Sequence, residues 1–390
     1  MAYMIRVHKI KLNPNSAQSE YFGKACGVAR HAYNWALGKW IEQHEAGLKP
    51  SELALRREYN AIKPIEFPWA MDVTKCAPQQ AIKNVGTAFQ NFFRRVKQGV
   101  KGKKAGYPKF KKKGVHDSFR ADNGPQEKGA DAVLVDGKSV KLPVIGWIRM
   151  RESVRFPGQI KSAVVSKMAD GWYVALAIET EAQLERKANN GTVGVDLGIK
   201  ALAVLSNGET VEGPNPHKLL LKRLRRLNQS LSRKVKGSAN WRKAKTKLAK
   251  LHKRIADIRN DAAHKLTTRL ATEFDTVAIE DLNVSGMTQN HCLARSIMDG
   301  GLSEIRRQIE YKAKMTGSNV VIVDRWFPSS KTCSSCGLIH IMPLSSRRMV
   351  CDCGNDMDRD LNAARNLAKY AASSAVSACG ASSSGVAKAA

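Results

Sequence analysis

The segment Thr192-Val-Gly-Val-Asp-Leu-Gly-Ile199 places an acidic residue at the edge of a short apolar run. Its valines alternate with glycine and Asp196, so a strand here puts the Asp196 carboxylate on the face opposite the valines. A second apolar run, Thr276-Val-Ala-Ile-Glu-Asp-Leu-Asn283, carries Glu280 near its end in the same way. We therefore expect both acids to lie at the edges of apolar strands.

The predicted elements around these two runs occur in a recognisable order. Asn207-Gly208 predicts the turn of a hairpin after Asp196, and leucines and isoleucines at heptad-like spacing then predict two long helices. A strand around Glu280 precedes a helix near residues 302–315, a strand at 319–324 and a short last helix that ends near residue 370. This order is that of a ribonuclease-H-like α/β domain, a mixed sheet with helices on its faces.

A third acid, Asp360, lies at the start of that last helix and is expected to converge on Asp196 and Glu280. One acid beside an apolar strand is usually a turn or cap residue, but three acids in this order, with basic surroundings, favour a shared site. Carboxylate oxygens suit Mg²⁺ or Mn²⁺ better than zinc. Two such ions about 4 Å apart would bind a scissile phosphate, activate water and stabilise the leaving oxygen, so no protein nucleophile is required.

Four of the eight cysteines lie close together near the end of the chain: Cys333, Cys336, Cys351 and Cys353. The others, at positions 26, 76, 292 and 379, are scattered singly, which favours a reduced, metal-binding protein over a disulfide framework. The motifs Cys-x-x-Cys-Gly and Cys-x-Cys-Gly predict four thiolates around one tetrahedral structural zinc ion, with each glycine letting backbone amides point at sulfur. Lys331 and Arg347-Arg348 on the same loop predict phosphate contacts.

The charge balance indicates a polyanionic partner. The chain has 65 Lys and Arg residues against 34 Asp and Glu residues, a net charge of +31, and nucleic acid is the obvious counterpart. Residues 218–259 contain sixteen basic residues against one acid, and residues 94–113 contain ten and no acid. Tyr107 and Phe110 in the second stretch favour phosphate contact with base stacking over a merely solvated loop.

A membrane is the competing partner for so basic a chain. No apolar run approaches the roughly 18 residues of a spanning helix, and the N-terminus lacks the apolar stretch of a signal peptide. We therefore expect no membrane association and a cytoplasmic location at the nucleoid.

The first half of the chain is predicted to be a small β-barrel interrupted by a helical domain. Residues 4–12 alternate as a strand does, Ser16 is the predicted N-cap of a helix whose apolar face covers residues 22–40, and a second helix covers residues 78–96. Residues 118–180 contain short apolar runs between Gly and Asp turns, which predict strands. The buried stripe of the second helix is predicted to contain Ala81, Val85, Ala88, Phe92 and Val96.

Several segments together match the motifs of one family. They are Lys11-Leu-Asn-Pro14, Gly106-Tyr-Pro-Lys-Phe-Lys-Lys-Lys113, Asp117-Ser-Phe-Arg120, Val195-Asp-Leu-Gly198, Ile279-Glu-Asp-Leu-Asn283, Pro328-Ser-Ser-Lys-Thr-Cys-Ser-Ser-Cys-Gly337 and Asp358-Arg-Asp-Leu-Asn-Ala-Ala364. The chain resembles TnpB, the transposon-encoded RNA-guided DNA endonuclease regarded as the ancestor of type V CRISPR effectors. Many members carry histidine before the Asp-Arg-Asp stretch, where this chain has Met357, so no role is carried over to that position.

The resemblance implies a multidomain protein that combines α/β and all-β parts. It implies a wedge-like β-barrel over 1–14 and 115–188, a helical recognition domain over 15–114, a RuvC-like nuclease domain over 189–325 and 356–370, and a zinc-ribbon-like insertion over 326–355 that binds target nucleic acid. Composition predicts a disordered tail over 371–390. The family's catalytic acids match Asp196, Glu280 and Asp360, and its partners would be a guide RNA and double-stranded target DNA.

Two other functions remain open from the sequence. The protein could be a catalytically silent RNA-guided repressor. Loss of one of the three acids would indicate a repressor, but all three are present. A structure-specific junction resolvase would use the same metals without RNA, but small resolvases lack the helical insertion, the zinc loop and the basic helices. No feature of the sequence specifies an oligomeric state.

Overall fold

The computed structural model describes residues 3–123, 132–181, 190–343 and 345–380. The chain divides into two compact units, Met1–Ala182 and Gln183–Ala390. Within the described residues, no helix has the length and apolar character needed to cross a bilayer.

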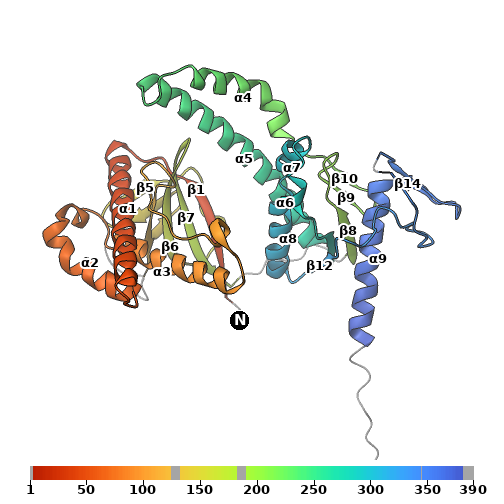
Figure 1. The fold of residues 1–390 in the computed structure, drawn as a ribbon, viewed down its shortest axis with the longest axis horizontal. Helices are drawn as coiled ribbons and strands as arrows, with labels where there is room; N and C mark the ends of the chain where they lie inside the picture. The colour runs from red at the N-terminus through yellow and green to blue at the C-terminus, as the bar shows by residue number, and fades with distance from the viewer. Residues whose placement is uncertain (1–2, 124–131, 182–189, 344, 381–390) are drawn as a thin grey trace, which may run out of the picture. The chain divides into compact units, whose positions relative to one another are not determined.

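The strands of the first unit form two sheets (Figure 1). The larger sheet is antiparallel, in the order β1 (Met4–Lys11), β7 (Gly171–Thr180), β6 (Gln159–Met168) and β2 (Ser118–Asp122). The smaller contains β3 (Leu134–Asp136), β4 (Ser139–Leu142) and β5 (Gly146–Arg149).

The predicted small barrel is not closed within the described residues, because both sheets are open. Closure would need continuous ladders between the sheets. The strands of the smaller sheet have only three or four residues, and one isolated bridge between Leu12 and Met150 connects the two. A bulge between Ile160 and Ser162 also interrupts the register of the larger sheet.

Three helices pack on these sheets: α1 (Ser16–Glu45), α2 (Glu52–Glu66) and α3 (Cys76–Lys97), with short 3₁₀ turns at Pro68–Met71 and Gly102–Ala105. They share one core with the strands, since Phe22 of α1 lies 5.2 Å from Trp172 and 5.9 Å from Phe119 between ring centroids. The helical domain and the sheets therefore have a common core rather than separate ones.

Two details of these helices differ from the predictions. The N-cap of α1 is Asn15 rather than Ser16, because Asn15 and Gln18 each accept a hydrogen bond from the other's backbone amide. In α3 the buried stripe includes Ala81 and Val85 as predicted, but Val96 is exposed beyond the end of the core. Helix α2 was not predicted.

The second unit contains the mixed sheet that the order of elements predicts. Its strands lie in the order β10 (Thr210–Val211), β9 (Ala203–Leu205), β8 (Thr192–Asp196), β11 (Thr276–Glu280) and β12 (Asn319–Val323). Strands β8, β11 and β12 are parallel, whereas the β8–β9–β10 hairpins are antiparallel.

Helices cover both faces of this sheet (Figure 1). Val277 and Ile279 of β11 pack on the side of α5 (Ala239–Glu273) and α8 (Leu302–Thr316). Ala278, between them, packs with Leu367 of α9 (Arg359–Gly380) on the other side. Helix α9 continues ten residues past the predicted end at Tyr370, and the last part of the predicted tail, 381–390, lies outside the described residues.

The two long basic helices are α4 (Pro216–Ser232) and α5, which extend together away from the sheet (Figure 1). A small core of Leu224, Leu251 and Ile255 joins them. The buried carboxylate of Asp299, in α7 (Ala294–Gly300), accepts hydrogen bonds from the His217 and Lys218 amides and so caps α4. Short helix α6 is Val284–Met287, and β13 (Arg348–Val350) pairs with β14 (Asp356–Asp358) in the cysteine segment.

Candidate acidic site and metal centre

Two of the three predicted acids lie on adjacent strands at one edge of the sheet. The parallel register pairs Ile279 of β11 with Val195 of β8, so Glu280 and Asp196 follow side by side at the carboxyl ends of these strands. This edge is where parallel strands of open α/β sheets usually present functional groups.

Helix α9 brings the third acid to this edge by packing directly on β8. A Cβ atom on Gly194 would overlap the carbonyl oxygen of Ala364 and lie 2.6 Å from the amide nitrogen of Ala368. Only glycine therefore permits this approach between strand and helix. The close packing fixes where the first turn of α9, with Asp360, lies relative to Asp196.

The two acids at the start of α9 have different roles. The Asp358 carboxylate accepts hydrogen bonds from the backbone amides of Asp360 (2.8 Å) and Leu361 (3.3 Å), which makes it a cap for the helix. Arg359 turns away and donates to the carbonyls of Pro343 and Ser346. Of the two acids, Asp360 is the one whose charge acts more strongly on Asp196.

Asp196 is affected by burial and by the charges of the other two acids. Burial, followed by the charges of Asp360 and Glu280, raises the pKa of Asp196 to about 7, although Arg359 opposes the shift. Burial also raises the pKa of Glu280, with a smaller effect of Asp281. The carboxylates are therefore close enough to repel one another.

The three carboxylates interact, but their oxygen atoms are not close enough together to form a metal-binding cluster in this structure. Among the residues that the structure describes, the four cysteines form the only cluster of three or more His, Cys, Asp or Glu side chains close enough to hold a metal ion. Like charges separate when no cation lies between them. Oxygen is the only donor atom that the three acids offer, which fits Mg²⁺ or Mn²⁺.

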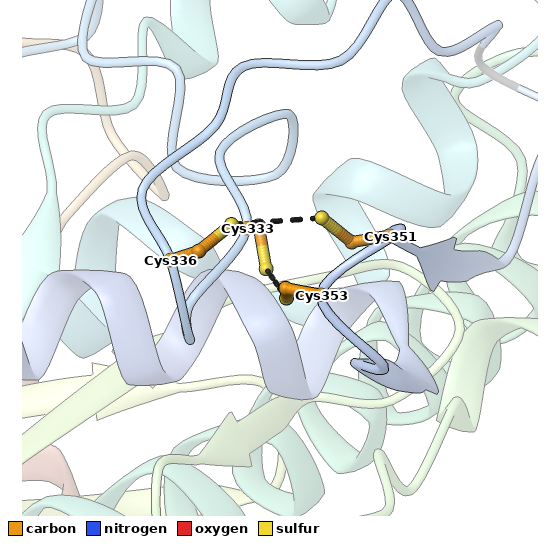
Figure 2. A group of neighbouring side chains, drawn as sticks. All are labelled: Cys333, Cys336, Cys351 and Cys353. Carbon is orange, nitrogen blue, oxygen red and sulfur yellow. Dashed lines mark hydrogen bonds between the residues drawn. The ribbon is translucent and has the colours of Figure 1, made fainter.

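The four cysteines are arranged as the zinc prediction requires, with side chains that point toward one another (Figure 2). All four sulfur atoms lie within 4.8 Å of one another, and the Cys333–Cys353 and Cys336–Cys351 pairs are 3.6 Å and 3.5 Å apart. A tetrahedral site with zinc–sulfur bonds of about 2.3 Å needs sulfur separations of roughly 3.8 Å. The cluster could therefore hold a metal ion between its four thiols, and it contains no disulfide.

The backbone around the cysteines supports thiolates. Gly337 and Gly354 have φ values of +84° and +88°, and their amides donate to the carbonyls of Cys333 and Cys351. Burial opposes ionisation of the Cys333 thiol, but the amides of Cys336 and Ser335 outweigh it and lower its pKa to about 6. For Cys351 the amide of Cys353 favours the thiolate, but burial and hydrogen bonds with the other cysteine side chains outweigh it and raise the pKa to about 12. The glycines thus act as the sequence predicts.

Two asparagines that sequence reasoning missed attach this cysteine module to α9. The fully buried Asn362 accepts a hydrogen bond from the Ser334 amide (2.8 Å) and donates to the Thr332 carbonyl (2.7 Å). Asn366, one turn later, donates to the carbonyls of Ser329 and Thr332. Their i, i+4 spacing after Asp360 was the available signal, since it puts both amides on one helix face.

A second missed group fixes the loop after β11. Asp281 forms ion pairs with Arg306 of α8 and Arg325, and its own amide donates to the Val323 carbonyl. These arginines hold the pKa of Asp281 below its usual range through hydrogen bonds, first from Arg325 and then from Arg306. Asp281 is therefore committed to structure, whereas Glu280 beside it is not.

The basic segment at residues 94–113 lies over the helices of the first unit. Lys111 lies 4.2 Å above the Tyr33 ring, and its amide donates to Asn34. Tyr107 packs edge-on against Phe92, while the Phe110 side chain is 54% exposed. This surface has the exposed cations and aromatic ring that the sequence suggests.

Three family models match different parts of the chain. Residues 175–291 match a family described as "Probable transposase", residues 303–367 match "Cas12f1-like, TNB domain", and residues 1–49 match "Helix-turn-helix domain". The last description differs from the structure, in which residues 4–11 form a strand and residues 16–45 a single helix.

Two curated relatives are similar over nearly the whole chain. A protein of Streptomyces pristinaespiralis named "Putative RNA-guided DNA endonuclease" is 36% identical, over 97% of this chain and 92% of its own length. InsQ of Escherichia coli, with the same description, is 34% identical over 96% and 94%.

A solved structure has a similar fold. The chain matches the protein in "Cryo-EM structure of the Cas12f1-sgRNA-target DNA complex" with a TM-score of 0.60 and 15% identity, over 91% of this chain and 83% of that one.

Proposed function

Because the chain belongs to the TnpB family of transposon-encoded RNA-guided DNA endonucleases, we propose that it cuts double-stranded DNA by metal-dependent hydrolysis under the direction of a transposon-derived guide RNA. The catalytic part is supported by the positions of Asp196 and Glu280 at the carboxyl ends of adjacent parallel strands, and by the charges of Asp360 and Glu280, which raise the pKa of Asp196.

In this proposal the three carboxylates are the catalytic residues and hold two Mg²⁺ or Mn²⁺ ions. Bound ions of this kind supply a Lewis acid and an activated water for phosphodiester hydrolysis. The carboxylates orient the site, and Asp196 must lose its proton before it can bind a cation. Its pKa of about 7 therefore makes metal affinity rise with pH up to neutrality.

The zinc module and the basic helices would hold nucleic acid around this site. Cys333, Cys336, Cys351 and Cys353 bind one structural zinc ion, and Asn362 and Asn366 fix the module to α9. Exposed cations on the module and on helices α4 and α5 would contact phosphates. The guide RNA would select the sequence by base pairing, and such partners place the protein at the nucleoid in the cytoplasm.

The test is to purify the protein with its bound RNA and incubate the complex with matching plasmid and Mg²⁺. We expect cleavage that needs both the RNA and the matching sequence, and none from Asp196→Ala, Glu280→Ala or Asp360→Ala complexes that still bind the target. Binding by the wild-type complex without cleavage would make the protein a repressor. Cleavage of branched DNA by RNA-free protein would make it a junction resolvase.

A further inference from the structure

Trp326 is an aromatic side chain left in solvent beside the acidic edge. Its side chain is 84% exposed, whereas none of the other six tryptophans is more than half exposed. The indole offers a large apolar surface with one polar N–H group, and tryptophan is enriched at interfaces, where a partner covers this surface.

The position of Trp326 in the chain places it near the proposed catalytic acids. Val323, the last residue of β12, is the register partner of Glu280. Trp326 is three residues further on, so its Cα lies no more than about 11 Å from that of Val323. That reach corresponds to roughly three nucleotides of a DNA strand, at about 3.4 Å per nucleotide.

The backbone on either side of Trp326 is held in place. Its own amide donates to the Asp324 carboxylate (2.7 Å), and the Phe327 amide donates to the Asp324 carbonyl (3.0 Å). Arg325 pairs with Asp281, and the Phe327 ring packs 5.1 Å from that of Tyr370 on α9. The turn therefore presents the indole outward from a fixed base, which lowers the entropy cost of binding to it.

Charge indicates what covers the indole. The segment that follows carries Lys331, Arg347 and Arg348, all exposed, in a chain of net charge +31. An exposed flat ring in a strongly basic chain, next to a proposed phosphodiester-cleaving site, fits a nucleobase, because every base has a face on which an indole can stack. An apolar protein surface would instead have to desolvate these cations.

We propose that Trp326 is a substrate-binding residue that stacks on a base of the DNA strand entering the acidic site, close to the scissile phosphate. The inference rests on the proposed nuclease function. Stacking there holds the phosphate near Asp196, Glu280 and Asp360, so it favours cleavage more than it favours guide-directed binding, which extends over the whole target.

The first test compares cleavage with target binding. Trp326→Leu should slow single-turnover cleavage about 5- to 150-fold, the change equivalent to about 1–3 kcal/mol of stacking at 1.4 kcal/mol per tenfold. Target affinity should change less than about twofold, and Trp326→Phe should retain most of the rate. The matched control is Ile65→Ala, which removes an equally exposed apolar side chain (84%) from the first unit and should leave the ratio of cleavage rate to target affinity unchanged.

The second test removes the base instead of the ring. Once the cut is mapped, abasic nucleotides are placed one at a time within three positions of it. One abasic site should slow the wild-type complex as much as Trp326→Leu does, and the same site should leave the variant's rate unchanged. Equal sensitivity of both complexes at every position, or wild-type cleavage by Trp326→Leu, would overturn the proposal.

A third measurement does not depend on cleavage. In an Asp196→Ala background, DNA with 2-aminopurine scanned along the strand should lose fluorescence at one position, and Trp326→Leu should restore it. If the wild-type complex never cuts but this quenching occurs, the nuclease function fails while the stacking role stands. If the Trp326→Leu variant quenches the fluorescence as much as the wild-type residue does, the stacking role is refuted while the nuclease function is unaffected. Trp326 would then be expected to contact a protein.

Discussion

Gly194→Ala tests whether cleavage depends on the position of α9 and its Asp360, since it changes none of the site residues themselves. The substitution leaves every acid, cysteine and basic residue in place. It adds one methyl group between β8 and α9, at the point where a Cβ atom would lie 2.6 Å from the Ala368 amide nitrogen and overlap the Ala364 carbonyl.

The size of the effect follows from this contact. Non-bonded heavy atoms rest at about 3.5–4.0 Å, so the 2.6 Å contact alone requires α9 to move by about 1 Å, and the overlap with the Ala364 carbonyl oxygen requires a larger movement. Overpacking of this kind typically costs about 1–3 kcal/mol of stability. Asp360 moves with the helix, and a displacement of about 1 Å in a reacting constellation can slow a reaction about 100-fold.

The assay is single-turnover cleavage by the purified ribonucleoprotein, with zinc content and target affinity measured in parallel. We expect cleavage to fall about 100-fold while RNA, zinc and target remain bound. Gly38→Ala is the matched control, because its added methyl meets no atom within 4 Å and it lies in helix α1. Wild-type cleavage and an unchanged Tm for Gly194→Ala would show that α9 does not position the acid.

Four further predictions concern the site residues. Cleavage at limiting Mg²⁺ should rise with pH up to about 7 and then level off, because Asp196 must deprotonate to bind a cation. The folded protein holds this proton to higher pH than the unfolded chain, so metal-free stability falls as pH rises toward 7 and Asp196→Asn should raise Tm above that pH. Cys333→Ser should lose zinc by mass spectrometry and lower Tm, whereas Cys292→Ser, an exposed single cysteine, should do neither. Asp358→Ala removes a helix cap and should cost about 0.5–2 kcal/mol in denaturant unfolding with cleavage reduced but present, whereas Asp360→Ala should abolish cleavage without lowering stability.

Each of these has a contrary result. A flat pH profile through neutrality would mean that Asp196 holds no ion. Full zinc content in Cys333→Ser would remove that thiolate from the zinc site. If Asp358→Ala were inactive and Asp360→Ala active, the two aspartates would have exchanged roles.

Local patterns predicted well wherever the interacting groups are close in sequence. The alternation before Asp196 and the apolar run before Glu280 predicted strands β8 and β11, and the glycines after the cysteine pairs predicted the left-handed turns. The N-cap of α1 was misplaced by one residue because both Asn15 and Ser16 are good caps, and only the reciprocal bonds with Gln18 select Asn15.

The sequence by itself determined the polyanionic partner, the order of strands and helices in the second unit and the cysteine ligand set, because charge, periodicity and short spacings are properties of neighbouring residues. Tertiary structure alone decided that the first unit's sheets stay open, that Asp358 caps α9 while the charge of Asp360 acts on Asp196, and that Asn362 and Asn366 attach the cysteine module to α9. Those outcomes depend on pairings between segments far apart in the chain, and a hydrogen bond or a steric contact exists only once its two partners have been brought together.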